Sequence, residues 1–240
     1  MRRLPLTGNL GPQAILLLIG LLASMSAVAN ADMAPNAIVG VTGMAFHQGD
    51  NADPGDGSLS RIFDGSGLTI GDAGDPSTWT HNSRWQDNWQ GQGAFTNSET
   101  PGGWLVADLG AVRDDLAKLY AWNVREVLDR GIQDVDVYVA SSPTALPVTG
   151  SPYDFSSGGW TALGAQTLPQ ATGADTAADA VLDLTGISGR YFGFNLKTNY
   201  GSTFRTGVAE LQFTTVPEPS SIVLGMLGLA IFGRFRRRSV

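Results

Sequence analysis

The stretch IQDVDVYVAS, residues 132–141, alternates apolar and polar side chains. Val135, Val137 and Val139 fall on one side of an extended chain, and Asp134, Asp136 and Tyr138 fall on the other. A period of two residues is typical of a β-strand that has one buried and one solvent-facing side. The pattern therefore predicts a strand at the surface of a core.

Similar short runs recur along the chain, separated by clusters of Gly, Pro, Asn, Asp and Ser. They predict further strands over residues 104–109, 119–124, 181–184, 191–196 and 208–215, with possible strands at 37–41 and near 160–163. Only residues 114–118 and 125–129 hint at helix, and both are short. With 31 glycines, 12 prolines and 15% charged residues, the composition also favours many turns and short strands. The sequence thus predicts an all-β fold, a β-sandwich, for the body of the chain at residues 32–216.

The first 31 residues have the three parts of a secretory signal peptide. Arg2 and Arg3 precede an apolar stretch over residues 14–23, and small residues follow, ending at Ala29, Asn30 and Ala31. We expect cleavage after Ala31, with Ala29 as the neighbouring option, and export of the remainder. The alternative is an uncleaved N-terminal anchor, for which the apolar run is short.

The net charge of the body excludes some classes of function. Residues 32–216 contain nine basic and 21 acidic side chains, a net charge of −12. Such a surface repels phosphate backbones, so we expect no nucleic-acid partner. The absence of cysteine excludes disulfides, thiolate metal sites and a cysteine nucleophile.

The C-terminus carries three elements in order. Pro217, Glu218 and Pro219 precede residues 222–233, which contain no charge, and a cluster of arginines begins at Arg234. Twelve residues make about 18 Å of helix, which is marginal against a hydrocarbon core of about 30 Å. Arginines stay on the cytoplasmic side, so the segment predicts a stop-transfer helix that leaves the body outside.

This arrangement resembles the PEP-CTERM sorting signal of bacterial exosortase substrates. The resemblance covers about the last 24 residues, 217–240. It implies transient insertion into the inner membrane, removal of the tail by an exosortase, and delivery to the cell envelope or the extracellular polysaccharide matrix. An ordinary C-terminal transmembrane anchor is the alternative.

Four stretches of the body resemble the discoidin or coagulation-factor type C family, whose members are galactose-binding-like jelly rolls. They are RIFDGSG with TW shortly after it, GGWLVADLG, RGIQDVDVYVASSP and RTGVAELQF, and together they span roughly residues 55–215. The chain departs from the family in the long loop after Trp79 and in the diffuse stretch 141–179. Ligand preference resides in such regions, so the resemblance does not transfer specificity.

The same resemblance implies a structural Ca²⁺ ion beside the first turn of the sandwich. Asp64 and Glu210 fall on the positions that hold it, and Asp72, Asp75 and Thr80 could contribute oxygens. Ca²⁺ takes six to eight oxygen ligands, which an acidic, glycine-rich loop can supply. Alternatively, Asp64 only shapes an Asp-Gly turn and Glu210 is a solvated strand residue.

The loop THNSRWQDNWQGQGAF combines aromatic and polar side chains. Sugar sites use an aromatic face against the apolar side of a pyranose and fixed polar groups for its hydroxyls. The candidate ligand-binding residues are His81, Asn82, Arg84, Trp85 and Trp89, with Asn123 and Arg125 on the same rim. For the two tryptophans the alternative is packing beneath a long loop. Arg205 is a weaker candidate, and Trp79 and Trp104 are expected to pack in the core.

Catalytic patterns are weak in the body. It has two histidines, without a close Ser-His-Asp spacing or an HExxH motif. We therefore predict a non-catalytic exported protein that binds extracellular polysaccharide. The alternatives are a structural biofilm or surface protein that makes only protein-protein contacts, and a hydrolase on a β-sandwich.

Overall fold

The computed structural model describes residues 36–47, 49, 57–92 and 103–216. Three sequence predictions lie outside these residues: the signal peptide at residues 1–31, the sorting motif Pro217, Glu218 and Pro219, and the apolar helix predicted after that motif. Among the described residues no helix is long and apolar enough to cross a membrane.

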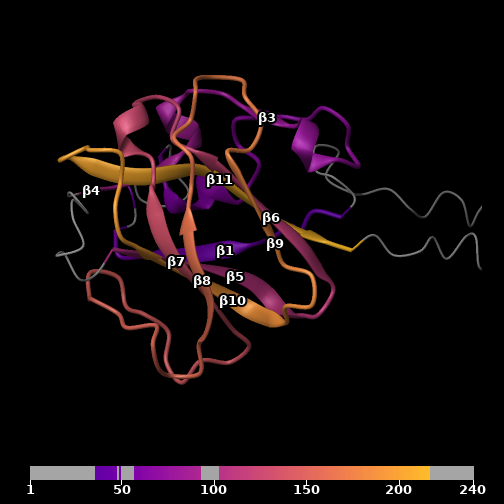
Figure 1. Cartoon of the computed structure of the whole chain (residues 1–240), viewed down its shortest axis with the longest axis vertical. Coiled ribbons are helices and arrows are strands. Elements are labelled where there is room, and N and C mark those ends of the chain that lie inside the picture. The colour runs from indigo at the N-terminus through magenta and orange to yellow at the C-terminus, as the bar shows by residue number, and fades with distance from the viewer. Residues whose placement is uncertain (1–35, 48, 50–56, 93–102, 217–240) are drawn as a thin grey trace, which may run out of the picture. The chain divides into compact units, whose positions relative to one another are not determined.

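The described strands form two main antiparallel sheets, which sandwich a core (Figure 1). The first sheet has the order β1 (Thr42–Ala45), β5 (Trp104–Arg113), β10 (Gly189–Leu196), β7 (Asp134–Ala140) and β8 (Thr161–Thr167). The second has the order β4 (Trp89–Gln92), β11 (Arg205–Thr215), β6 (Leu116–Asn123) and β9 (Ala180–Asp183). The hairpin of β2 (Leu68–Thr69) and β3 (Thr80–His81) and the short 3-10 turns η1 (Leu59–Ile62), η2 (Pro76–Thr78), η3 (Trp85–Asp87) and η4 (Leu128–Arg130) complete the described elements. The predicted all-β sandwich is confirmed.

The alternating pattern of β7 has the expected result. Val135, Val137 and Val139 are buried in the core between the sheets, while Asp134 and Asp136 are half-buried on the other face. This core also contains Phe192 and Phe213, whose ring centroids lie 5.0 Å apart. The two strands that carry them, β10 and β11, belong to different sheets, so this ring pair joins the layers.

Two smaller clusters cover the outer faces of the sheets. Trp104, Phe155 and Trp160 pack over the first sheet beneath the loop that joins β7 to β8, which extends below the strands in the view of Figure 1. Gly193 is required here because a Cβ at this position would lie 2.3 Å from a ring carbon of Phe155. Trp79 and Trp122 pack over the second sheet beneath residues 64–82. Trp79 and Trp104 are thus packing residues, as predicted.

Both helix predictions are wrong. Residues 114 and 115 form the turn between β5 and β6, and β6 already begins at Leu116. Of residues 125–129, only the last two belong to the three-residue turn η4. The prediction at 37–41 is only partly correct, because Ala37 forms an isolated bridge with Thr214 and the first strand starts at Thr42.

Candidate functional site

The segment 80–92 divides its tryptophans between core and surface. Trp89 opens β4, where it lies opposite Val208 of β11, and it has no exposed surface. Its indole nitrogen donates a hydrogen bond to the carbonyl oxygen of His47 at 3.0 Å. A buried ring cannot stack on a sugar, so the structure supports the packing alternative for Trp89.

Trp85 and Arg84 are exposed. Trp85 is 39% exposed, and the side chain of Arg84 is 66% exposed. A Cβ on Gly57 would lie 3.1 Å from the Trp85 ring, so Gly57 lets the chain approach this ring closely. Asn82 is half-buried and accepts a hydrogen bond from the Arg84 amide at 2.9 Å, while its own amide donates to Asp87 at 2.9 Å. These bonds hold the turn that presents Trp85.

His81 lies beneath this turn and has no exposed surface. Its Nδ1 lies 2.8 Å from the Asn82 carbonyl oxygen, whereas its Nε2 has no hydrogen-bond partner among the described residues. Burial lowers the pKa of the imidazole below its ordinary value, so His81 is neutral at pH 7. Its backbone exchanges hydrogen bonds with Asp175 and Thr176, which cover it.

Asn123 ends β6 and Arg125 lies just after it, but neither side chain reaches a surface rim. The Asn123 amide donates to the carbonyl oxygens of Ile132 at 2.7 Å and Pro169 at 3.1 Å. The Arg125 guanidinium lies 2.8 Å from the Asp179 carboxylate, and the Arg125 side chain has no exposed surface. Both residues therefore anchor the segment before β9 to the end of β6.

Glu210 is a fully buried acidic residue. It lies on β11 without exposed surface, and its Oε1 accepts hydrogen bonds from the Gly65 amide at 3.3 Å and from the Gln212 side chain. Its Oε2 has no hydrogen-bond partner among the residues described. Burial raises the pKa of this carboxyl well above its ordinary value, and the charges of Asp64 and Asp87 add to the shift.

The other predicted calcium ligands have local roles. Asp64 is exposed and accepts from the Ser66 amide at 2.8 Å. Asp72 accepts from the Gly74 amide, and Asp75 accepts from the Ser77 amide at the start of η2. Within the part of the chain that the structure describes, no group of three or more His, Asp or Glu side chains could hold a metal ion.

Sequence reasoning missed Phe204. This side chain is 61% exposed in the loop between β10 and β11. The guanidinium carbons of Arg205 and Arg130 lie 4.8 and 5.9 Å from its ring centroid. Arg130 also donates to Gln90 of β4 at 2.8 Å. The available signal was an aromatic residue in the polar stretch NYGSTFR, where no strand pattern requires one.

Trp85 and Phe204, the large aromatic side chains that are exposed among the described residues, lie beyond opposite ends of β4. Trp85 precedes Trp89, the first residue of this strand, and Phe204 precedes Arg205, which pairs with its last residue, Gln92. Four strand residues span about 13 Å. The surface therefore offers two aromatic positions, each beside an arginine, rather than one pocket.

Comparison with known proteins gives one match by family. The family described as PEP-CTERM protein-sorting motif matches residues 215–239. This is the motif of exported proteins that an exosortase processes, and it confirms the sorting motif predicted at the C-terminus. A search of curated protein sequences found no match.

Solved structures resemble the body only distantly. The family 32 carbohydrate-binding module of Clostridium perfringens NanJ, solved with galactose, has a TM-score of 0.46 and 13% identity, over 74% of this chain and 97% of that one. A Streptococcus pneumoniae fucose binding module has a TM-score of 0.43 and 14% identity, over 76% and 98%. A family 89 glycoside hydrolase from C. perfringens has a TM-score of 0.39 and 16% identity, over 77% of this chain and 16% of the hydrolase.

Proposed function

We propose that this protein is exported, processed by an exosortase, and binds extracellular polysaccharide without catalysis. The observation that carries the proposal is the pair of exposed aromatic side chains, Trp85 and Phe204, at the two ends of β4. Exposed aromatic rings stack on the apolar faces of sugars, and neighbouring polar groups bind the hydroxyls. The sorting motif delivers such a protein to the surface where these polysaccharides lie.

The arrangement suits a chain of sugars better than a single one. β4 itself is about 13 Å long, which exceeds one pyranose ring, so an oligosaccharide that lies along β4 would have to contain several sugar units to contact both aromatic rings. Arg84 lies beside Trp85, while Arg130 and Arg205 lie beside Phe204. Guanidinium groups donate several hydrogen bonds in a fixed geometry, so these arginines can bind the hydroxyl groups of sugars that stack on the neighbouring rings.

Tryptophan fluorescence tests the proposal directly. All six tryptophans lie in the described residues, and Trp85 is the one with a large exposed fraction. Titration with a panel of neutral and acidic polysaccharides should include at least one that shifts the emission of the wild type, and W85F should remove that shift. A panel of acidic and neutral glycans that leaves both the fluorescence and the binding signal unchanged would contradict the proposal and favour a purely structural surface protein.

The proposal includes a structural Ca²⁺ ion at Glu210, with Asp64 and backbone carbonyl oxygens of the loop that carries Asp64 as the other ligands. The support is the buried Oε2 of Glu210, which has no partner among the described residues. A buried carboxylate without compensation is strongly destabilising, and a bound cation would remove that penalty. Ca²⁺ should raise the melting temperature of the wild type and leave that of E210Q unchanged. Equal melting curves with calcium and with chelator would contradict it.

A further inference from the structure

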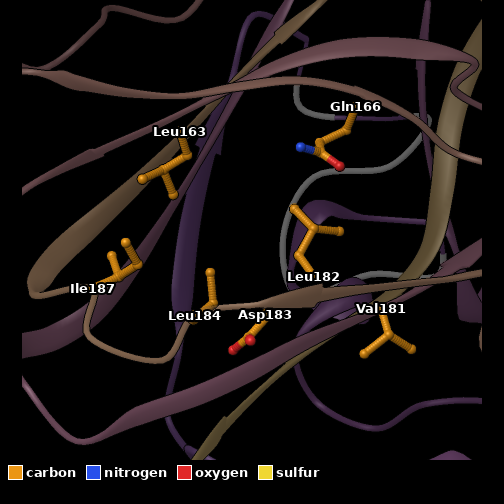
Figure 2. A pocket seen from close by; sticks show the side chains of 7 residues that line it. All are labelled: Leu163, Gln166, Val181, Leu182, Asp183, Leu184 and Ile187. Carbon is orange, nitrogen blue, oxygen red and sulfur yellow. The ribbon is translucent and has the colours of Figure 1, made fainter.

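A groove with an exposed lining that is part polar and part aliphatic lies on the side of the sandwich where β8 and β9 face each other. Its volume is about 230 Å³, and it is lined by Leu163, Gln166, Val181, Leu182, Asp183, Leu184 and Ile187. In Figure 2, the side chains of Leu182 and Leu184 point toward the side where Leu163 and Gln166 lie. Those of Val181 and Asp183 point to the opposite side. A cavity of about 150 Å³ holds a benzene-sized ligand, so the groove has room for one or two aliphatic side chains.

The strands that border the groove are the outermost strands of their sheets among the described residues. β8 has the sequence TALGAQT and β9 the sequence AVLD, so neither carries a lysine, arginine or proline. Soluble proteins usually protect edge strands with such residues, because a free edge pairs readily with another extended segment. Val181 on β9 is 49% exposed. The edge is therefore suited to an apolar segment in extended conformation.

The described chain ends close to this edge. Thr215, the last residue of β11, pairs with Leu116 of β6, and on the other side of β6 Lys118 pairs with Asp183 of β9. Neighbouring strands lie about 4.8 Å apart, so the free edge of β9 is about 10–15 Å from the end of β11. Residues 217–221 can span up to about 17 Å when extended. Residues 222–224, Ile-Val-Leu, are therefore the first apolar residues that reach the groove.

We propose that the start of the apolar run of the sorting tail, residues 222–224, docks along the free edge of β9 with its side chains in this groove until the membrane takes the tail up. Direction favours this pairing. β11 and β9 both run antiparallel to β6, so a chain that turns back after Thr215 runs antiparallel to β9. The β-branched Ile222 and Val223 suit an extended conformation.

Charge also favours the docked tail. The segment ends with Arg234, Arg236, Arg237 and Arg238, and the body to which it is tethered has a net charge of −12. The groove would shield an apolar run in water before its insertion, and a bilayer would compete with the groove for the same side chains. The sorting tail is then held by the body rather than free during export.

Cysteine cross-linking tests this because the natural chain has no cysteine. In full-length protein without the signal peptide, V181C is paired in turn with I222C, V223C and L224C and oxidised in detergent-free buffer. Docking predicts an intramolecular disulfide that forms at least tenfold faster for one tail position than the others. Adding lipid vesicles should slow formation of this disulfide, because the bilayer competes with the groove for the apolar side chains. Val181 is half-exposed, so its replacement leaves the core intact.

Two controls separate docking from the nearness that a short tether imposes. The first control adds I222S and L224S to the V181C and V223C pair. This variant keeps the length of the tether but removes the apolar side chains that enter the groove, so its rate of disulfide formation should fall about tenfold. V148C, on the exposed loop over the other sheet, should not cross-link with the tail. Equal rates in the serine variant overturn the proposal, as does a disulfide formed only between molecules, which would assign the groove to a second copy. None of these outcomes depends on glycan binding.

Discussion

The guanidinium of Arg125 lies 2.8 Å from the carboxylate of Asp179, and the two side chains are 0% and 8% exposed. Asp179 also accepts a hydrogen bond from the backbone N–H of Asn123 at 2.7 Å. Arg125 donates in addition to Thr176 and Ala177. Through this pair the segment between β8 and β9, which also forms backbone hydrogen bonds with His81, is fastened to the end of β6.

Removal of one partner of this pair should destabilise the fold strongly. R125A leaves the Asp179 carboxylate buried without its cation, and breaking a buried pair in this way costs about 3–5 kcal/mol. Urea unfolding followed by circular dichroism measures the change. The matched control is R190A, which breaks the surface pair with Asp108, where the arginine is 36% exposed. If R190A lowers the free energy of unfolding as much as R125A, burial is not what makes the Arg125 pair important.

Glu210 should make the stability of the cation-free protein fall as pH rises. Its pKa is raised in the folded state, so the folded protein binds the proton more tightly than the unfolded chain. The destabilisation is absent below the unfolded pKa of about 4.3 and grows as pH increases toward the folded pKa. Melting temperatures of the wild type and E210Q in chelator, from pH 4 to pH 8, should diverge with the variant more stable at the upper end.

Calcium should remove that divergence if it binds at Glu210, because the cation stabilises the ionised carboxylate. E210Q acts as its own control, since it keeps the shape of the side chain and cannot ionise. If the melting temperature of the wild type rises faster from pH 5 to pH 7 than that of E210Q, the pKa of Glu210 is not raised by burial in the folded protein.

Trp85 and Trp89 should respond to replacement in opposite ways. W89A removes a fully buried ring from the core and should cost about 3–5 kcal/mol of unfolding free energy. W85A should change that free energy much less and weaken glycan binding about tenfold or more. F204A should behave like W85A. Chemical denaturation and affinity electrophoresis give the two readouts, and a W85A protein that binds as the wild type does removes Trp85 from the site.

Any side chain at position 193 should lower the free energy of unfolding. A Cβ there would lie 2.3 Å from Phe155, so G193A must displace the ring that secures the loop over the first sheet. Overpacking of this kind costs about 1–3 kcal/mol, and limited proteolysis should cut the loop between β7 and β8 faster. G74A is the control, because its new Cβ meets nothing closer than 3.5 Å. Equal cleavage rates for G193A and the wild type would show that Phe155 adapts without loosening the loop.

The strands could be predicted because their signal is local. Alternation over Val135, Val137 and Val139 identifies β7 from ten letters, and the same reasoning located β5, β6, β9, β10 and β11 to within a few residues. The helix predictions failed because a short polar run between two strands is compatible with a helical turn or with a hairpin. The antiparallel pairing of β5 and β6 with different neighbours decides between them.

The tail and the class of fold followed from the sequence alone, since the spacing of Pro217–Glu218–Pro219, the apolar run and the arginines is linear, and strand periodicity is local. Burial is different. Trp85 and Trp89 are four residues apart and chemically identical, yet only the second pairs across to β11 and enters the core. The local sequence is compatible with either a buried or an exposed position for Arg125 and Glu210, and it does not identify Phe204 as an exposed residue. Their exposure depends on partners far away in the chain, Asp179, Gly65 and Arg130, which only the tertiary structure brings into contact.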